Sequence, residues 1–129
     1  MKTKQCDVGN LEKTDEGFLL FTVTCAGQEI TGEQMLEVVH LIDVTVESST
    51  PLLIDARQRH SASYGALIEM SKGKQISAVA IYAPEGRSYH SANYIEKFQT
   101  MAGHSPYPFK TFTDLEKAKY WLSSFLMAS

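Results

Sequence analysis

Two short apolar runs, Leu52–Asp55 and Ile76–Tyr82, constrain the fold of this chain more than any other feature. Each has the length of a strand and is mostly apolar, which is typical of strands buried on both faces of a parallel sheet. Segments in which apolar residues recur at helical spacing lie before, between and after these runs. Strands that alternate with helices in this way predict a mainly parallel sheet with right-handed crossovers.

Capping patterns mark the start of two predicted helices. Thr31-Gly-Glu-Gln34 has the sequence of a capping box, and the apolar residues behind it keep helical spacing as far as Ile42. Thr113-Asp-Leu-Glu116 is a second such pattern, with Thr113 as the expected cap. It opens a last helix whose buried stripe we expect to include Trp121.

Two further helices and an edge strand are expected between these points. The second helix should begin near Ser61 or Ser63 and end at about Ser71, where a glycine-containing break follows. The third should run from about Arg87 to about Met101. Phe109–Phe112 is then short enough to form an edge strand before the last helix.

The N-terminal region predicts an antiparallel hairpin. Cys6–Lys13 and Phe18–Thr24 are rich in β-forming residues, and the turn Thr14–Gly17 separates them. This register places Cys6 almost opposite Cys25, although a shift of one residue separates the two thiols. Reduced cysteines that pack as small apolar groups are the alternative.

The resulting order is β-β-α-β-α-β-α-β-α in a single domain over residues 1–129, a common domain size. A formal net charge of −3 disfavours nucleic acid as a partner, because phosphate binding needs a basic face. No apolar run reaches the ~18 to 20 residues of a membrane span, and the N-terminus lacks the apolar stretch of a signal peptide. We therefore expect a cytoplasmic protein with no nucleic-acid or membrane partner.

Three segments together resemble the STAS (SpoIIAA-like) domain family, especially a bacterial branch of small stand-alone proteins: Leu52–Arg57, Ile76–Ile81 and Phe112–Leu122. The third is the most specific, a strand that ends in Phe-Thr-Asp before a helix with Ala-x-x-Trp-Leu. The resemblance spans residues 18–125. It implies an α/β SpoIIAA-like fold, with a mixed, mostly parallel sheet, an N-terminal β-hairpin and about four helices. It also implies action by binding rather than by catalysis, because none of the matching motifs is catalytic.

The resemblance also bears on Ser63. Family members that act as anti-sigma-factor antagonists are regulated by phosphorylation of a serine in an Asp-Ser-Ser-Gly-like sequence, at the start of the helix after the central strand. Ala62-Ser63-Tyr64-Gly65 keeps one serine and the glycine, but it lacks the aspartate and has tyrosine in place of the second serine. A phosphate is tolerated at a helix N-terminus, and a role as an ordinary cap also explains Ser63.

A polar cluster is expected at the carboxyl end of the first buried run, where ligands of open α/β sheets bind. It consists of Asp55 with Arg57, Arg59 and His60. The alternative is that Asp55 accepts hydrogen bonds from amides of its own loop or pairs with Arg57. An enzyme would need the side chains of Asp55, Arg57 and His60 to converge. Neither a nucleophile elbow nor histidines at metal-ligand spacing support a catalytic or metal site.

Arg87 and Tyr89 form a second candidate site, because Pro84-Glu-Gly-Arg87 precedes a predicted helix and helix N-termini attract anions. An ordinary strand-to-helix turn with a solvated arginine is the alternative. The third helix also carries Tyr94 and Phe98. Exposed aromatic side chains there would form a partner surface, for which homodimerisation is the simplest cover.

The function we expect is that of a non-enzymatic STAS-like module that binds or regulates an unidentified protein partner, acts as a homodimer and needs no cofactor. The alternative is a carrier of a small apolar or anionic ligand in a pocket between sheet and helices. A cavity lined by Phe, Leu and Met favours the carrier, and a filled core with an exposed aromatic patch favours protein binding. The candidate interaction or regulatory residues are Asp55, Arg57, His60, Ser63, Arg87 and Tyr89.

Overall fold

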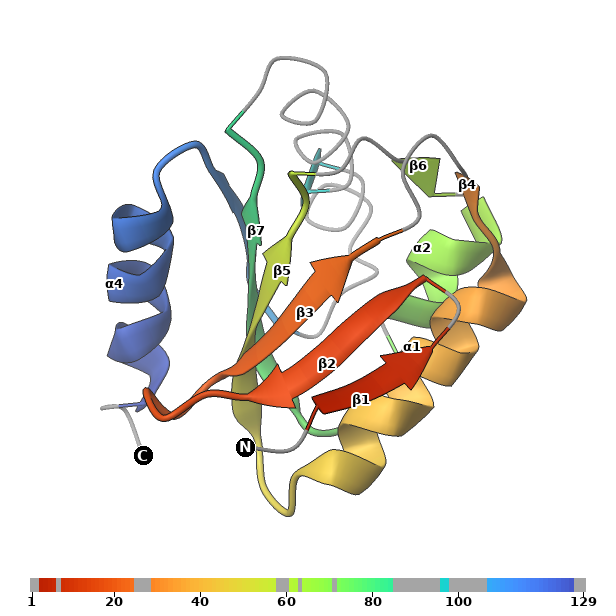
Figure 1. The fold of residues 1–129 in the computed structure, drawn as a ribbon, viewed down its shortest axis with the longest axis horizontal. Helices are drawn as coiled ribbons and strands as arrows, with labels where there is room; N and C mark the ends of the chain where they lie inside the picture. The colour runs from red at the N-terminus through yellow and green to blue at the C-terminus, as the bar shows by residue number, and fades with distance from the viewer. Residues whose placement is uncertain are drawn as a thin grey trace.

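A six-stranded mixed sheet forms the centre of the protein in the computed structural model (Figure 1). The structure describes residues 3–6, 8–24, 29–57, 61–62, 64–70, 72–84, 96–97 and 107–126. The strands follow the order β1-β2-β3-β5-β7-β8. Their bounds are β1 Thr3–Cys6, β2 Gly9–Lys13, β3 Leu19–Val23, β5 Thr50–Asp55, β7 Ile76–Tyr82 and β8 Phe109–Phe112.

The pairing of the strands confirms the predicted mixed, mostly parallel sheet. The β1–β2 and β2–β3 pairs are antiparallel, whereas β3–β5, β5–β7 and β7–β8 are parallel. The two apolar runs that first indicated this fold, in β5 and β7, lie side by side at the centre of the sheet and are almost wholly buried. A separate parallel pair joins β4 Glu29–Ile30 to β6 Ser61–Ala62, two short strands that the sequence did not indicate.

The predicted single strand Cys6–Lys13 is wrong. The chain reverses between Cys6 and Gly9, which are paired across β1 and β2. Cys6 therefore lies one strand away from β3, and the expected placement opposite Cys25 does not hold for Cys6; Cys25 itself lies outside the described residues. Gly9 fits this position because an added Cβ would lie 2.2 Å from the carbonyl oxygen of Thr22.

The turn between β2 and β3 is the predicted one. The Thr14 hydroxyl and amide both donate to the carbonyl of Phe18, over 2.7 and 3.1 Å. Gly17 has a φ of 100°, which only glycine adopts without strain. The hairpin is thus closed by local hydrogen bonds and one left-handed residue.

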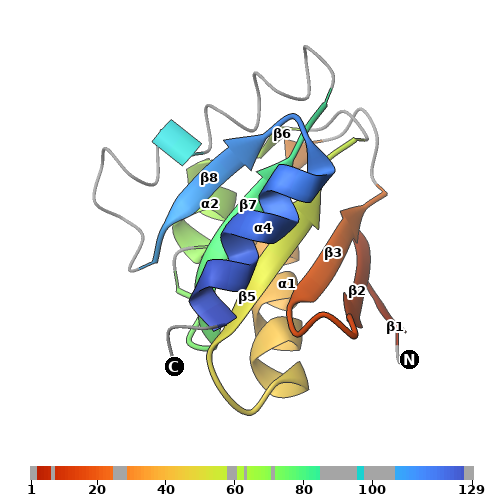
Figure 2. The same ribbon diagram turned by 90° about the vertical axis from the view of Figure 1, so that its left-hand side faces the viewer.

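Three helices lie within the part of the chain that the structure describes: α1 Gly32–Thr45, α2 Tyr64–Met70 and α4 Leu115–Leu126. Helices α1 and α2 cover one face of the sheet, and α4 covers the other (Figure 2). The capping box before α1 is confirmed, since Thr31 and Gln34 exchange side-chain and backbone hydrogen bonds over 3.2 and 3.0 Å. The predicted third helix falls almost entirely outside the described residues.

The predicted cap of the last helix is off by one residue. Asp114, not Thr113, accepts hydrogen bonds from the first amides of α4, those of Glu116 at 2.9 Å and Lys117 at 3.4 Å. Both residue types cap helices well, and the carboxylate also interacts favourably with the positive end of the helix dipole. Ser61, one of the two expected caps of the second helix, lies in β6 instead.

Each face of the sheet has its own apolar core. Beneath α1 and α2 the core includes Phe21, Ile54 and Ile81. On the α4 side it is smaller and includes Leu53 and Leu122. Within the described ranges, no helix is long and apolar enough to cross a membrane.

Polar contacts fasten the chain before β7 to α1 and the chain before β8 to α2. The Asp43 carboxylate on α1 accepts hydrogen bonds from the amides of Lys74 and Gln75, the shortest at 3.1 and 3.0 Å. The Tyr107 hydroxyl donates to the carbonyl of Met70 at the end of α2. Burial raises the pKa of Tyr107 well above its ordinary value, and the negative charge of Asp43 adds to that effect.

Candidate functional site

The predicted strand-end cluster is built around Asp55, the last residue of β5. Asp55 lies between Thr22 of β3 and Tyr82 of β7 in the sheet register, and only 9% of its surface is exposed. Its Oδ1 atom accepts hydrogen bonds from the backbone amide of Arg57 at 3.2 Å and from the Arg57 Nε at 3.0 Å. Its Oδ2 atom accepts from Nε at 3.1 Å and from Nη2 at 2.7 Å.

The electrostatics of this pair indicate a structural clamp. The hydrogen bond to Asp55 and the negative charge of Asp55 raise the pKa of Arg57. The Arg57 side chain is 63% exposed, whereas that of Asp55 is 12% exposed. Because both carboxylate oxygens accept hydrogen bonds from Arg57, Asp55 orients the first residues of the loop. This is the arrangement expected under the alternative interpretation of Asp55.

The remaining candidate residues of the predicted sites, Arg59, His60, Ser63, Arg87 and Tyr89, lie outside the described residues. Among the described residues of the predicted cluster, the structure brings together Asp55 and Arg57. The short β4–β6 pair places Ser61–Ala62, just after the Asp55 loop, beside the start of α1.

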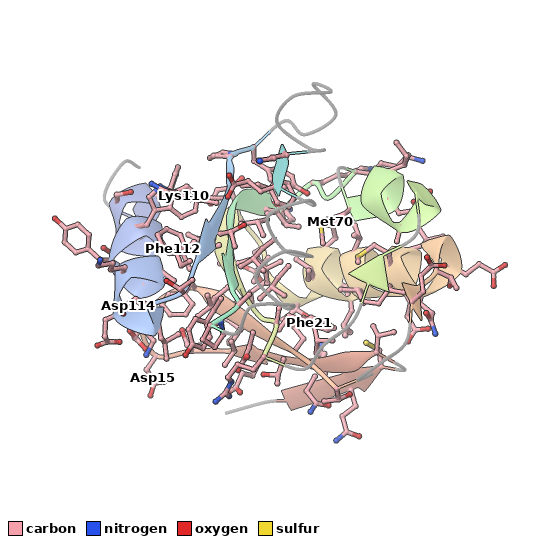
Figure 3. The ribbon with its side chains drawn as sticks, turned by 90° about the horizontal axis from the view of Figure 1, so that it is seen from above. Asp15, Phe21, Met70, Lys110, Phe112 and Asp114 are labelled. Atoms are coloured by element: carbon pink, nitrogen blue, oxygen red, sulfur yellow. The ribbon has the colours of Figure 1, made fainter. Side chains whose placement is uncertain are left out.

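A small apolar cavity lies between the sheet and helices α1 and α2. Its volume is about 40 Å³, and it is lined by Phe21, Val23, Ile30, Met35, Val38, Val39, Ile42, Leu52, Ile54, Ala56, Met70, Ile76 and Ile81. Figure 3 shows Phe21 and Met70 on this side of the sheet. The lining includes Phe21, Leu52 and two methionines, but isoleucine and valine make up most of it. The volume falls far below the roughly 300 to 1,000 Å³ of ordinary ligand pockets.

An open groove on the other side of the sheet was not predicted. We call it the β8–α4 groove. It has a volume of about 440 Å³ and is lined by Lys110, Phe112, Glu116, Lys117, Tyr120, Trp121 and Ser124. Figure 3 shows Lys110 and Phe112 facing α4.

Aromatic rings in tilted and edge-on contact lie at the β8–α4 groove. Trp121 lies 5.7 Å from Phe112 and makes an edge contact with Phe125 at 4.8 Å, measured between ring centroids. Tyr120, the next residue, is 81% exposed. The Lys110 ammonium sits 5.6 Å from the centre of the Phe112 ring. Trp121 is half-buried, so the expectation that it lies fully inside the core is corrected.

The sequence did contain a sign of this groove. Tyr120 lies directly before Trp121 and therefore points about 100° away from it around the helix. An aromatic residue outside the apolar stripe of a helix is more typical of a contact surface than of a core.

The comparisons with known proteins bear on the fold. No family model matches the chain, and no curated protein matches it. Among solved structures, the chain is similar to an uncharacterised protein of the DUF3478 family from Shewanella loihica PV-4, described as having a SpoIIAA-like fold. The two are 20% identical with a TM-score of 0.55, and the match covers 94% of this chain and 99% of the other. The SpoIIAA-like fold predicted from the sequence is thereby confirmed.

Proposed function

We propose that the protein is a non-enzymatic binding module of the SpoIIAA-like fold that recognises a protein partner through the β8–α4 groove. The observation that carries this proposal is the exposed aromatic surface of α4, with Tyr120 81% exposed beside the half-buried Trp121. Tyrosine and tryptophan are enriched in the parts of interfaces that supply most of the binding energy.

The aromatic side chains of the groove are preorganised for binding a partner. Trp121 is held between Phe112 and Phe125, so its side chain loses little conformational freedom when a partner binds. Lys110 and Lys117 flank the rings, against a single carboxylate at Glu116. A partner segment that combines apolar and acidic side chains suits this surface best.

The absence of catalysis is part of the proposal. Asp55, the buried carboxylate at the carboxyl end of the central strands, has both oxygens occupied by Arg57. The fold itself hosts binding functions in the family that the sequence resembles, and a fold alone carries no activity.

Site-specific photo-crosslinking tests the proposed surface. A photoreactive amino acid replaces Tyr120 in the groove, and a matched variant carries it at Gln5, which is exposed on β1 at the opposite edge of the sheet. In the host cell, we expect a discrete protein adduct from position 120 and none from position 5. Equal labelling at both positions, or none at either, would contradict the proposal.

A second copy of the chain is one candidate for the partner, in line with the homodimer expected from the sequence. Native mass spectrometry of the protein purified from its host reports the number of subunits. A dimer that dissociates when Tyr120 is replaced by serine would identify the second copy as the partner. A monomer in both proteins would direct attention to a different protein.

The apolar cavity favours a second candidate, a carrier of a small apolar ligand. Two flexible methionines, Met35 and Met70, line it, and their repacking can enlarge a pocket. Native mass spectrometry of the purified protein also distinguishes a ligand carrier from a protein-binding module. A retained mass of roughly a few hundred daltons, which the cavity must expand to hold, would favour the carrier, whereas the bare chain mass supports protein binding.

A further inference from the structure

The stretch of sequence that contains α1 carries acidic side chains without basic ones. Between residues 14 and 56 the sequence contains eight acidic residues and no lysine or arginine. The acidic residues are Asp15, Glu16, Glu29, Glu33, Glu37, Asp43, Glu47 and Asp55. Helix α1 lies in the middle of this stretch, on the side of the sheet away from the β8–α4 groove (Figure 2).

Helix α1 also exposes apolar side chains where burial is not expected. Leu36 is 54% exposed and Val44 is 58% exposed. The buried residues of α1, which include Val38 and Ile42, occupy the opposite side of the helix. Leu36 and Val44 therefore face directly into solvent and do not border the core.

These residues form one continuous stripe. Glu33, Leu36, Glu37, His40 and Val44 follow the three- and four-residue spacing of neighbours along a helix, and all five are exposed. We call this stripe the α1 outer face. It combines two separate apolar side chains, Leu36 and Val44, with acidic neighbours over about three turns of helix.

The two glutamates of the α1 outer face, unlike the nearby Asp43, do not hold other parts of the fold in place. Asp43 is bound to backbone amides beyond α1. In contrast, no hydrogen bond or ion pair between described residues involves the side chains of Glu33 or Glu37. Lys74 contacts the carboxyl end of α1 through its backbone amide. Helix α1 itself contains no lysine or arginine.

We infer that the α1 outer face is a docking surface for a basic amphipathic helix of a partner protein. Such a helix presents apolar side chains to Leu36 and Val44 and places lysine or arginine beside Glu33 and Glu37. This inference rests on α1 alone and does not depend on the β8–α4 groove.

A second copy of the same face fits poorly. In an antiparallel pair centred on His40, Glu33 of one copy would oppose Glu47 of the other, and Glu37 would oppose Asp43. Like charges opposed in this way disfavour association. The acidity that favours a basic partner therefore acts against self-pairing through α1.

A model peptide provides the test. The probe is a leucine–lysine peptide of about 14 residues, roughly four helical turns, with helical periodicity. It is titrated into the isotope-labelled full-length protein and followed by amide chemical shifts. We expect the shifts to change along Glu33–Val44, and a leucine–glutamate peptide of the same pattern to leave them unchanged.

Matched variants decide whether the face is responsible. Replacing both glutamates (Glu33→Gln with Glu37→Gln) should weaken binding about tenfold, and Leu36→Ser with Val44→Ser should weaken it by a similar factor. Tyr120→Ser, on the opposite side of the sheet, should leave the affinity unchanged. These positions are exposed, so the circular dichroism of each variant should match that of the natural protein.

Three results would overturn the inference. The first is shift changes centred on the β8–α4 groove. The second is an affinity that does not respond to the glutamate variant. The third is self-association through α1, seen as concentration-dependent shifts without peptide, which would make a second copy the occupant. None of these results bears on the crosslink expected at Tyr120, so the two proposals fail independently.

Discussion

Replacing Tyr107 with phenylalanine tests how the segment before β8 is fastened to α2. Tyr107 is 6% exposed, and its hydroxyl donates to the carbonyl of Met70. Phenylalanine keeps the ring that stacks on Phe109 at 5.4 Å between centroids, so the main loss is one buried hydrogen bond. Leaving the Met70 carbonyl without this donor should lower the free energy of unfolding by about 1 to 2 kcal/mol at pH 7.

The same residue predicts a specific pH dependence. Burial, with a smaller effect from the charge of Asp43, raises the pKa of Tyr107 in the folded state. The folded protein therefore holds the phenolic proton more tightly than the unfolded chain does. The stabilisation is fully present below the ordinary tyrosine pKa of about 10 and is lost as the pH rises above it, at up to about 1.4 kcal/mol per pH unit.

Urea unfolding of the natural protein and of Tyr107→Phe, from pH 7 to pH 11, measures both effects. All other titrating groups are common to the two proteins, so they cancel in the difference. The advantage of the natural protein should shrink by about 1.4 kcal/mol by pH 11. Tyr120→Phe, at an 81% exposed position, is the control and should leave stability unchanged. Parallel curves for the natural protein and Tyr107→Phe would refute the buried, protonated tyrosine.

Three other substitutions address the remaining contacts. Asp114→Ala should cost about 1 kcal/mol through loss of the helix cap, whereas Thr113→Ala should cost nothing measurable in thermal unfolding; the reverse ranking would restore Thr113 as the cap. Trp121→Ala should destabilise the protein by about 2 kcal/mol, less than for a fully buried tryptophan, and a loss under about 0.5 kcal/mol would contradict the packing of Trp121 between Phe112 and Phe125. A double-mutant cycle of Asp55→Ala and Arg57→Ala should give a coupling near 1 kcal/mol, because Arg57 is largely exposed; zero coupling would mean that the clamp adds nothing.

The sequence predicted the central strands and their neighbours because burial dictated their composition. Ile76–Tyr82 and Phe109–Phe112 have the predicted bounds, and the helix capped by Thr31 buries the predicted side chains. The prediction of one strand over Cys6–Lys13 was wrong because Val8 is apolar and 1% exposed. The alternation of apolar and polar residues therefore continued through a reversal of the chain. Periodicity alone does not distinguish a buried turn residue from a buried strand residue.

The candidate sites were harder to predict for a physical reason. Asp55 and Arg57 are two residues apart, so their contact is local and could be anticipated from the chain. The β8–α4 groove depends on how far α4 leans over Phe112, which is a property of packing between distant segments. Thr113 and Asp114 are both good caps, and only the point where the helix begins decides between them.

The contact between Glu96 and Thr111 has a consequence for aggregation. β8 is the last strand of the described sheet, and the backbone amide of Thr111 donates to the carboxylate of Glu96. An edge strand with unpaired amides is a template onto which another chain can add a strand. Here a charged side chain occupies one such amide, so an incoming strand would have to displace a carboxylate before it could pair. The carboxylate of Glu96 thereby hinders β-augmentation at Thr111.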